Sequence, residues 1–321
     1  MSDTPMAQPL RALMATMNAM SKLKIGPSMQ SIVATPHAER IARKNPGVMA
    51  RPVTGIDTED VYVQGRGGPI HTRIYQRAGT APGAPGYLFI HGGGFALGGV
   101  EFCDHVCREL AKRSGFVVVG LSYRLAPEYP FPAGIEDCQD VLSWMAREAP
   151  GGLDPERLAV GGESAGGTFT TLLALWARDN NGPRIAHHAP IYPLTDFTAS
   201  MIDWTEGNAG NPGVTPAIWD LAAGVYCTDH DRKDPLVSPA FADHAGLPPA
   251  LVVTCGHDIL RNEGVALASS YEAAGVDVTH SHLDDMPHGY LLMTRLTKRS
   301  YETIDLMISE AKRYFSLAEA R

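Results

Sequence analysis

Short runs of β-branched and aromatic residues alternate with segments of helical periodicity along the chain after about residue 55. Eight of these runs are predicted as strands, at residues 61–63, 70–75, 87–90, 116–121, 158–160, 189–192, 251–254 and 276–283. Segments with a helical period are predicted as helices at residues 103–113, 135–147, 165–178, 263–274 and 300–315. Strands that alternate with helices form a mainly parallel sheet covered on both faces. We therefore predict an α/β fold whose eight-stranded sheet begins with an antiparallel hairpin around residues 65–69.

Two segments do not follow this alternation, and we expect both to be helical. In the first, apolar side chains recur at helical spacing on one face: Leu10, Leu13, Met14, Met17 and Met20. In the second, Thr215 and Pro216 are typical of an N-cap and a first helical position. Together the two segments are predicted to form a helical cap over the sheet. The predicted organisation is an N-terminal part of the cap at 1–50, a core at 51–195, a cap insertion at 196–235 and the rest of the core at 236–321.

Charge and composition argue against several classes of partner. The formal net charge is −8 at pH 7 and no cluster of lysine and arginine occurs, so a nucleic-acid partner is not expected. The N-terminus lacks the features of a signal peptide and no apolar run reaches membrane-spanning length, so we expect a soluble, cytoplasmic protein. The five cysteines contain no Cys-x-x-Cys pair and are expected to be buried free thiols. Cys103 and Cys107 are four residues apart on a predicted helix, but core packing is favoured over a metal site there, and we predict neither a metal nor an organic cofactor.

Residues 162–166 read Gly-Glu-Ser-Ala-Gly between a predicted strand and a predicted helix. This is the Gly-x-Ser-x-Gly pattern of a sharp strand-to-helix turn that exposes a nucleophilic serine, with glycines where neighbouring backbone leaves no room for Cβ. By itself the five-residue match could equally be a glycine-rich turn with an incidental serine. Its position at the end of a strand favours Ser164 as a nucleophile, next to the positive end of a helix dipole.

His91 and three consecutive glycines follow the third predicted strand. In serine hydrolases with such a turn, this position supplies the second half of the oxyanion hole. We assign the backbone N–H groups of Gly93, Gly94 and Ala165 as oxyanion donors. His91 is predicted to orient this loop by hydrogen bonding rather than to transfer protons.

A serine hydroxyl needs a base, and the base needs an anionic partner, in the chain order Ser, Asp or Glu, His. Asp258 follows the strand predicted at 251–254, and His288 follows the last strand, so both return to the edge of the sheet that carries Ser164. Other residues are rivals for the two roles, as base His257, His280 and His282, and as acid Glu263, Asp284 and Asp285. His280 and His282 alternate within a strand, and Asp284 and Asp285 lie on the strand that delivers His288, so Asp258 and His288 are favoured.

In combination these motifs resemble the bacterial hormone-sensitive-lipase-like esterases of the α/β-hydrolase superfamily. The resemblance runs from about residue 85 to 290 and is carried by 91–98, 123–128, 131–133, 162–167, Asp258 and His288. It implies a carboxylesterase for short to medium acyl chains, with a cap built from the N-terminus and the later insertion, and a possible homodimer through the last strand and helix. Arg124 and Glu128 are expected to brace the loop behind the oxyanion hole. We expect the substrate site to be lined by Met14, Met17, Phe95 and Trp204.

Three residues depart from the common pattern of that family. Glu163 stands where aspartate or threonine is usual, Ile259 where proline is usual, and Asn262 where aspartate is frequent. None of the three removes a catalytic group, so they concern the pH optimum and the stability of the loops rather than the reaction.

The predicted reaction is ester hydrolysis through an acyl-serine, with Ser164 as nucleophile, His288 as general base and acid, and Asp258 orienting His288. Two alternatives stay open. One is a non-catalytic small-molecule receptor on the same fold. The other is an amidase or peptidase that uses the same three residues.

Overall fold

One sheet of eight strands forms the centre of the molecule. The computed structural model describes residues 5–6, 8–22, 29–45, 49–202 and 214–319. The strands are β1 Ile56–Gly65, β2 Gly68–Arg77, β3 Ala84–Ile90, β4 Val117–Leu121, β5 Leu153–Glu163, β6 Ile185–Ile191, β7 Ala250–His257 and β8 Val278–Pro287, in the spatial order β1-β2-β4-β3-β5-β6-β7-β8. β1 pairs antiparallel with β2, and β2 with β4, whereas the later pairs are parallel. The predicted mostly parallel sheet with an antiparallel edge is confirmed.

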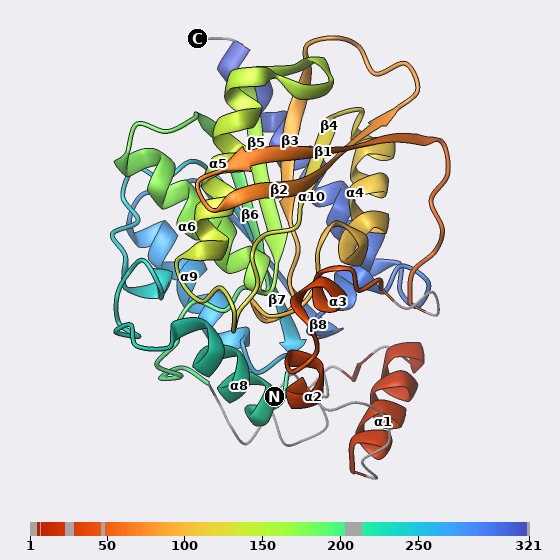
Figure 1. The fold of residues 1–321 in the computed structure, drawn as a ribbon, viewed down its shortest axis with the longest axis vertical. Helices are drawn as coiled ribbons and strands as arrows, with labels where there is room; N and C mark the ends of the chain where they lie inside the picture. Colours follow the sequence, from red (N-terminus) through yellow and green to blue (C-terminus); the bar gives the residue numbers. More distant parts are fainter. Residues whose placement is uncertain (1–4, 7, 23–28, 46–48, 203–213, 320–321) are drawn as a thin grey trace.

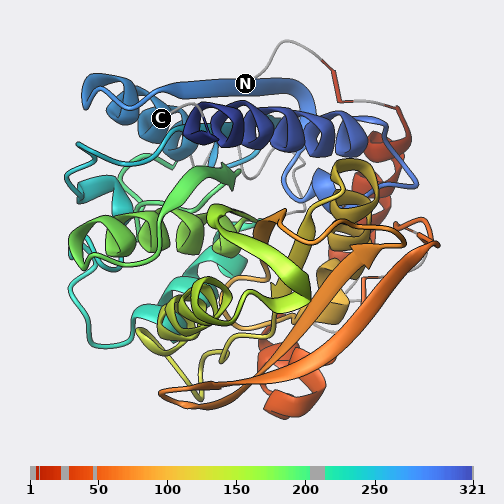
Figure 2. The ribbon, with the colours of Figure 1, turned by 90° about the horizontal axis from the view of Figure 1, so that it is seen from above.

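Helices cover both faces of this sheet (Figures 1 and 2). α4 and α10 pack on one face, and α5, α6 and α9 lie on the other. The helices are α1 Gln8–Lys22, α2 Met29–Val33, α3 His37–Ile41, α4 Val100–Ser114, α5 Ala133–Glu148, α6 Ala165–Asp179, α8 Pro216–Cys227, α9 Arg261–Ala273 and α10 Arg299–Glu319, with short 3-10 turns η1 Pro150–Gly152, η2 Pro239–Phe241 and η3 Tyr290–Leu292. None of the helices in the described ranges is long and apolar enough to cross a membrane.

The last strand is longer than its sequence pattern predicts. β8 continues through the polar residues Asp284 and Asp285 to Pro287. β7 stays paired with it as far as His257 opposite Pro287, across a register shift after Cys255. Backbone pairing, rather than an alternation of apolar side chains, therefore determines where β8 ends and where the following loop begins.

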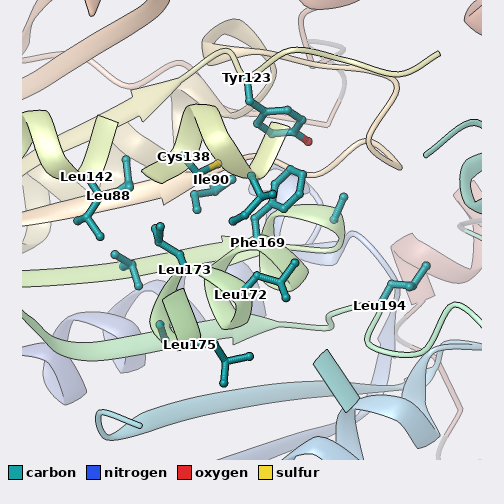
Figure 3. Packing of buried hydrophobic residues seen from close by; sticks show 14 of the residues in the cluster. Leu88, Ile90, Tyr123, Cys138, Leu142, Phe169, Leu172, Leu173, Leu175 and Leu194 are labelled. Atoms are coloured by element: carbon teal, nitrogen blue, oxygen red, sulfur yellow. The ribbon is translucent and has the colours of Figure 1, made fainter. Parts of the chain in front are cut away.

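Two clusters of buried apolar side chains fill the space between the sheet and its helices. Figure 3 shows part of the first, in which Leu88 and Ile90 from β3 lie near Leu142 from α5 and Phe169 and Leu173 from α6. The second lies under α4 and α10. All five cysteines are free and buried. Because protein interiors are close-packed, these clusters hold the carboxyl ends of β3, β5, β7 and β8 in fixed positions at one edge.

The helices α1, α2, α3 and α8 gather at one end of the molecule (Figure 1). α2 packs against α8. Thr215 is the N-cap of α8, since its Oγ1 accepts the N–H of Ile218 at 3.3 Å, and Pro216 is the first helical residue, as predicted. We refer to residues 29–45, 49 and 214–227 as the cover. The four-part division of the chain into cap and core segments stays a prediction.

Candidate active site

The turn between β5 and α6 holds Ser164 in a strained backbone conformation. Its φ is 55° and its ψ −121°, a region that residues other than glycine rarely adopt. A Cβ on Gly162 would lie 2.4 Å from the Gly166 carbonyl oxygen, and one on Gly166 would lie 2.1 Å from that of Ile90. Both distances are far below van der Waals contact, so glycine is required at each position. The tight turn places the Ser164 hydroxyl at the N-terminus of α6, which begins at Ala165.

Ser164, His288 and Asp258 form a hydrogen-bonded relay at the carboxyl edge of the sheet. The Nε2 of His288 lies 2.9 Å from the Ser164 Oγ, and its Nδ1 lies 2.7 Å from an Asp258 carboxylate oxygen. Asp258 and His288 are both buried, and the other Asp258 oxygen accepts the N–H of Leu260 at 2.9 Å. The Nδ1–H tautomer of His288 therefore leaves Nε2 free to accept the serine proton.

The charges around His288 favour its protonated form. Burial by itself lowers the pKa of this ring, but the Asp258 charge and hydrogen bond, with the charge of Glu163 in addition, outweigh burial. The pKa of His288 consequently lies above its usual value. A ring with a raised pKa is a stronger base toward the serine hydroxyl.

Four of the rival residues have other partners, and His257 is the last residue of β7, opposite Pro287 of β8. His280 and His282 both contact the Thr254 hydroxyl within the β7–β8 pair, at 2.9 and 2.8 Å. Asp285 lies 3.5 Å from the guanidinium of Arg299. Asp284 lies 3.3 Å from His282 Nε2. The structure thus brings Asp258 and His288 to Ser164, from the loops after β7 and β8.

Glu263 is a second buried carboxyl near this edge. It accepts the backbone N–H of Thr195 at 2.7 Å and that of Asp196 at 3.1 Å. Burial raises the pKa of Glu263 to about 8. These hydrogen bonds hold the segment after β6, which gives Glu263 a structural role.

The glycine loop after β3 adopts conformations that need glycine. Gly93 has a φ of 106° and Gly94 of 59°. A Cβ on Gly93 would lie 2.0 Å from the carbonyl oxygen of Leu97. Gly93, Gly94 and Ala165, the three predicted N–H donors, all line one cavity together with Ser164.

His91 is fully buried behind this loop. Its Nδ1 lies 2.6 Å from the carbonyl oxygen of Gly92, and its ring stacks on Tyr123 with centroids 4.1 Å apart. Burial lowers the pKa of His91 to about 4, so the ring is neutral at pH 7 and its Nδ1–H can donate to that carbonyl. These contacts favour the predicted orienting function.

The cavity beside Ser164 has a volume of about 320 Å³ and a mostly apolar wall. Its lining from the core comprises Gly93, Gly94, Phe95, Leu97, Phe102, Glu163, Ser164, Ala165, Leu194, Leu260, His288, Gly289, Leu292 and Met293. Its lining from the cover comprises Asn45, Met49, Val214, Ile218, Trp219 and Ala222. Pockets of this size and character accommodate small, largely apolar ligands.

Of the four residues predicted to line the substrate site, the structure brings Phe95 to the cavity. It does not bring Met14 there, because the apolar face of α1 is used for packing: Met14 is buried in the same cluster as Leu10. Trp204 and the side chain of Met17 lie outside the described residues. Phe95 itself stacks on Tyr226 of α8, with ring centroids 4.1 Å apart.

Sequence patterns did not indicate Arg40, which joins the cover to the glycine loop. Its side chain is fully buried, and one guanidinium nitrogen donates to the carbonyls of Ala96 at 2.5 Å and Ala126 at 2.6 Å. Another nitrogen pairs with Glu128, and the Arg40 carbonyl accepts the N–H of Gly98 at 3.1 Å. A single arginine in a short helix carries no signal for such contacts, because the carbonyls of Ala96 and Ala126 and the Glu128 side chain are more than 50 residues away in the sequence.

Arg124 and Glu128 contact different partners behind the loop. Arg124 forms an ion pair with Asp137 at 2.8 Å, and Glu128 forms one with Arg40. Both bonds involve segments next to the glycine loop, which supports the expected bracing role.

The three departures from the family pattern have distinct surroundings. Glu163 is buried, and one of its carboxylate oxygens accepts the N–H of Gly92 at 2.6 Å. Ile259 is buried in the apolar cluster under α5, α6 and α9. Asn262 donates to the carbonyl of Met201 at 3.2 Å. Ile259 and Asn262 therefore stabilise the loop after Asp258, whereas Glu163 contacts the glycine loop.

No group of three or more histidine, cysteine, aspartate or glutamate side chains within the described ranges is arranged to hold a metal ion. Cys103 and Cys107, whose sulfur atoms are 3.9 Å apart, are both buried in the cluster under α4.

Known proteins resemble the chain over most of its length. A family model described as alpha/beta hydrolase fold matches residues 87–292. Carboxylesterase NlhH of Mycobacterium tuberculosis is 36% identical over 250 residues, which cover 76% of this chain and 78% of that protein. Carboxylic ester hydrolase LipN of the same organism is 33% identical over 293 residues, covering 89% and 77%. The solved structure of an esterase from Pyrobaculum calidifontis has a TM-score of 0.80 and 31% identity, covering 96% of this chain and 99% of that one. The chain therefore belongs to the α/β-hydrolase family, among the hormone-sensitive-lipase-like carboxylesterases that its sequence resembles.

Proposed function

We propose that the protein is a serine carboxylesterase that hydrolyses esters of short to medium acyl chains through an acyl-serine intermediate. The observation that carries the proposal is the relay in which His288 lies between the Ser164 hydroxyl and the Asp258 carboxylate, at 2.9 and 2.7 Å. The names of the relatives, carboxylesterase and carboxylic ester hydrolase, support the same reaction class.

In the first half of the reaction, His288 removes the Ser164 proton as the serine oxygen attacks the ester carbonyl. The carbonyl oxygen becomes negative and accepts hydrogen bonds from the N–H groups of Gly93, Gly94 and Ala165. Protonated His288 is stabilised by Asp258 and then gives its proton to the departing alcohol oxygen. Ser164 is left acylated.

In the second half, water enters beside His288 and loses a proton to it while attacking the acyl carbon. The same three N–H groups hold the second oxyanion. The carbon–oxygen bond to Ser164 breaks, the proton returns from His288 to the serine oxygen, and the carboxylic acid leaves. Each half begins and ends with a neutral His288.

The size and wall of the cavity support short to medium, uncharged acyl groups. Its volume of about 320 Å³ is near the lower end of ordinary ligand pockets. Its described wall is mostly apolar and carries no lysine or arginine, so a charged acyl group would lose hydration without gaining an ion pair.

Hydrolysis of p-nitrophenyl esters from acetate to laurate tests the proposal. The purified protein should cleave short esters and show falling kcat/KM as the chain lengthens. Ser164→Ala should lose about 10⁴-fold or more of kcat, because the nucleophile is absent, and should no longer be labelled by a fluorophosphonate. Full activity of folded Ser164→Ala would contradict the assignment of the nucleophile.

The same assays separate the two alternatives. A receptor would bind esters without turnover and would not react with the fluorophosphonate. An amidase or peptidase would cleave a matched anilide with appreciable turnover, even if more slowly than the ester. Our proposal requires labelling, and ester turnover without appreciable anilide turnover.

A homodimer through the last strand and helix is also a proposal. β8 is an end strand of the sheet, and unpaired strand edges are sites where a second chain can pair. Light scattering coupled to gel filtration should give twice the chain mass, and a monomer mass at high micromolar concentration would contradict it.

A further inference from the structure

Glu163 connects the serine turn to the glycine loop through a side chain. It is the last residue of β5 and directly precedes Ser164. Its side chain is buried, and one oxygen accepts the N–H of Gly92, the first glycine of the loop, at 2.6 Å. A Cβ on Gly92 would lie only 2.3 Å from that oxygen, so the close approach requires glycine there. The end of β3 and the end of β5 are thus joined by this contact as well as by strand pairing.

The contact constrains the loop that carries the proposed oxyanion donors. Gly92 is followed immediately by Gly93 and Gly94, whose positive φ values already separate them from regular strand geometry. Glycine has little conformational preference of its own, so a loop of three glycines needs an external partner to hold one orientation. The Glu163 carboxylate is such a partner at the first of the three. Without it, the Gly92 N–H would be buried without an acceptor, and the loop would gain by rotating.

Glu163 also lies close to His288: it directly precedes Ser164, whose Oγ is 2.9 Å from His288 Nε2, and both residues line the same cavity. Burial raises the pKa of Glu163, whereas the charge of His288 and the hydrogen bond from the Gly92 N–H both lower it. The groups that interact electrostatically with Glu163 come from four elements or loops: His288 after β8, Tyr192 after β6, Tyr123 after β4 and Cys103 in α4. His288 in turn is next to Asp258, Ser164 and the ring of Tyr192, whose centroid is 4.8 Å away. Of these neighbours, Asp258 and Glu163 are the two carboxylates that raise the pKa of His288.

We propose that Glu163 is a positioning residue with two effects: its oxygen holds the oxyanion loop through Gly92, and its negative charge stabilises the protonated His288 that forms in each half-reaction. This inference rests on the proposed esterase function. Glu163 does not exchange a proton with the substrate; it acts through Gly92 and His288. The two effects can be separated, because an amide oxygen keeps the first and removes the second.

Glu163→Gln is the variant that separates them. The glutamine oxygen can still accept the Gly92 N–H, so the loop keeps its orientation, and kcat at pH 8 should fall only about three- to tenfold through the lost stabilisation of protonated His288. Loss of the negative charge should lower the pKa of His288 and move the acid limb of kcat/KM to lower pH, by roughly half a unit or more. The measurement is kcat/KM for p-nitrophenyl butyrate from pH 5 to 9. A purely structural role for Glu163 would leave that limb where it is.

Glu163→Ala removes both effects. Because the Gly92 N–H then loses its acceptor, kcat should fall about 10- to 100-fold. This loss is no larger than the loss of kcat expected when one oxyanion donor is removed entirely. KM should change less than threefold. Fluorophosphonate labelling and the melting temperature show whether the variant is folded. Should it fail to fold, the pH profile of Glu163→Gln decides the question alone.

Glu263→Gln is the matched control. Glu263 is also a fully buried glutamate that accepts backbone N–H groups, those of Thr195 and Asp196. Its pKa of about 8 leaves it mostly protonated across the acid limb, so an amide changes little charge there, and the limb should not move.

The outcomes distinguish this inference from the proposed function. If the unaltered protein cleaves no ester and is not labelled, the proposed function fails. If the unaltered protein is active while Glu163→Gln has an unmoved acid limb and folded Glu163→Ala keeps its kcat, the function stands and the role of Glu163 is wrong. A shifted limb in Glu163→Gln but not in Glu263→Gln supports the electrostatic effect, and a larger loss of kcat in Glu163→Ala than in Glu163→Gln supports the positioning effect.

Discussion

At the carboxyl edge of the sheet, backbone groups and buried polar side chains determine where each residue lies. Ser164, Gly93 and Gly94 have positive φ values, and the backbone packs too closely around Gly93 to leave room for a Cβ. His288 is oriented by its hydrogen bond to Asp258. The cover meets the same cavity with a different chemistry. Its lining side chains are mostly apolar, such as Ile218 and Trp219, and they make contacts without direction. We therefore expect activity to be more sensitive to small displacements at the edge than to changes in the shape of the cover.

Arg40 is where the two regions meet. From the cover it donates to carbonyls beside the glycine loop and accepts the N–H of Gly98. Directional hydrogen bonds thus connect the loop to a cover whose cavity lining is mostly apolar.

Asp258→Asn should have the largest effect. Asparagine keeps the shape but donates to His288 Nδ1 or leaves it unoriented, so the ring no longer presents Nε2 as a base, and kcat should fall on the order of 10⁴-fold. Steady-state kinetics with p-nitrophenyl butyrate measure it. Asp285→Asn is the control, since Asp285 contacts Arg299 and its kcat should change less than twofold. Equal losses in the two variants would show that the edge does not depend on the His288–Asp258 pair.

Gly93→Ala tests the backbone of the edge. The new Cβ would lie 2.0 Å from the Leu97 carbonyl oxygen at a φ of 106°, so the loop must move and kcat should fall about 10²–10³-fold. Gly83→Ala is matched to it, because Gly83 has a φ of 78° but nothing within 4 Å of its Cβ position. The control should lose about 1–2 kcal/mol of stability and keep its kcat. A kcat loss in both would assign the effect to general destabilisation.

The pH profile tests the electrostatics of the edge. Activity requires neutral His288, so kcat/KM should rise as pH increases through its pKa. That pKa is raised by Asp258 and Glu163, so the midpoint should lie above the usual value of about 6.5, with about a tenfold loss for each pH unit below it. A midpoint below 6 would mean that burial outweighs the two carboxylates.

Trp219→Ala tests the cover and should have the smallest effect on rate. Removing this part of the cavity wall makes room for longer chains, so the ratio of kcat/KM for decanoate to that for butyrate should rise about tenfold while kcat for butyrate stays within threefold. Trp144→Ala, a partly buried tryptophan of α5 that does not line the cavity, is the control and should leave the ratio unchanged. A large loss of kcat for butyrate in Trp219→Ala would show that the cover, too, depends on exact geometry.

The contrast between the regions also explains which residues could be predicted. Ser164, Asp258 and His288 each follow a strand, and the carboxyl ends of parallel strands meet at one edge, so their proximity follows from chain order. The glycines could be predicted because a positive φ or a close approach restricts the residue type. The residues that line the cavity could not be predicted, because the apolar face of a helix can pack in the core or line a pocket equally well. Met14 shows this: its helical spacing fits both, and the structure buries it in the core.

The order of strands and helices, the serine turn, the glycine loop and the family could all be predicted from the sequence, because they depend on local conformation and chain order. The contacts of Arg40 with the glycine loop, the hydrogen bond from Gly92 to Glu163 and the lining of the cavity could be seen only in the folded molecule. These contacts join groups tens of residues apart, through hydrogen bonds to backbone atoms or through apolar packing. Neither kind of contact restricts the residue type enough to be recognised in one sequence.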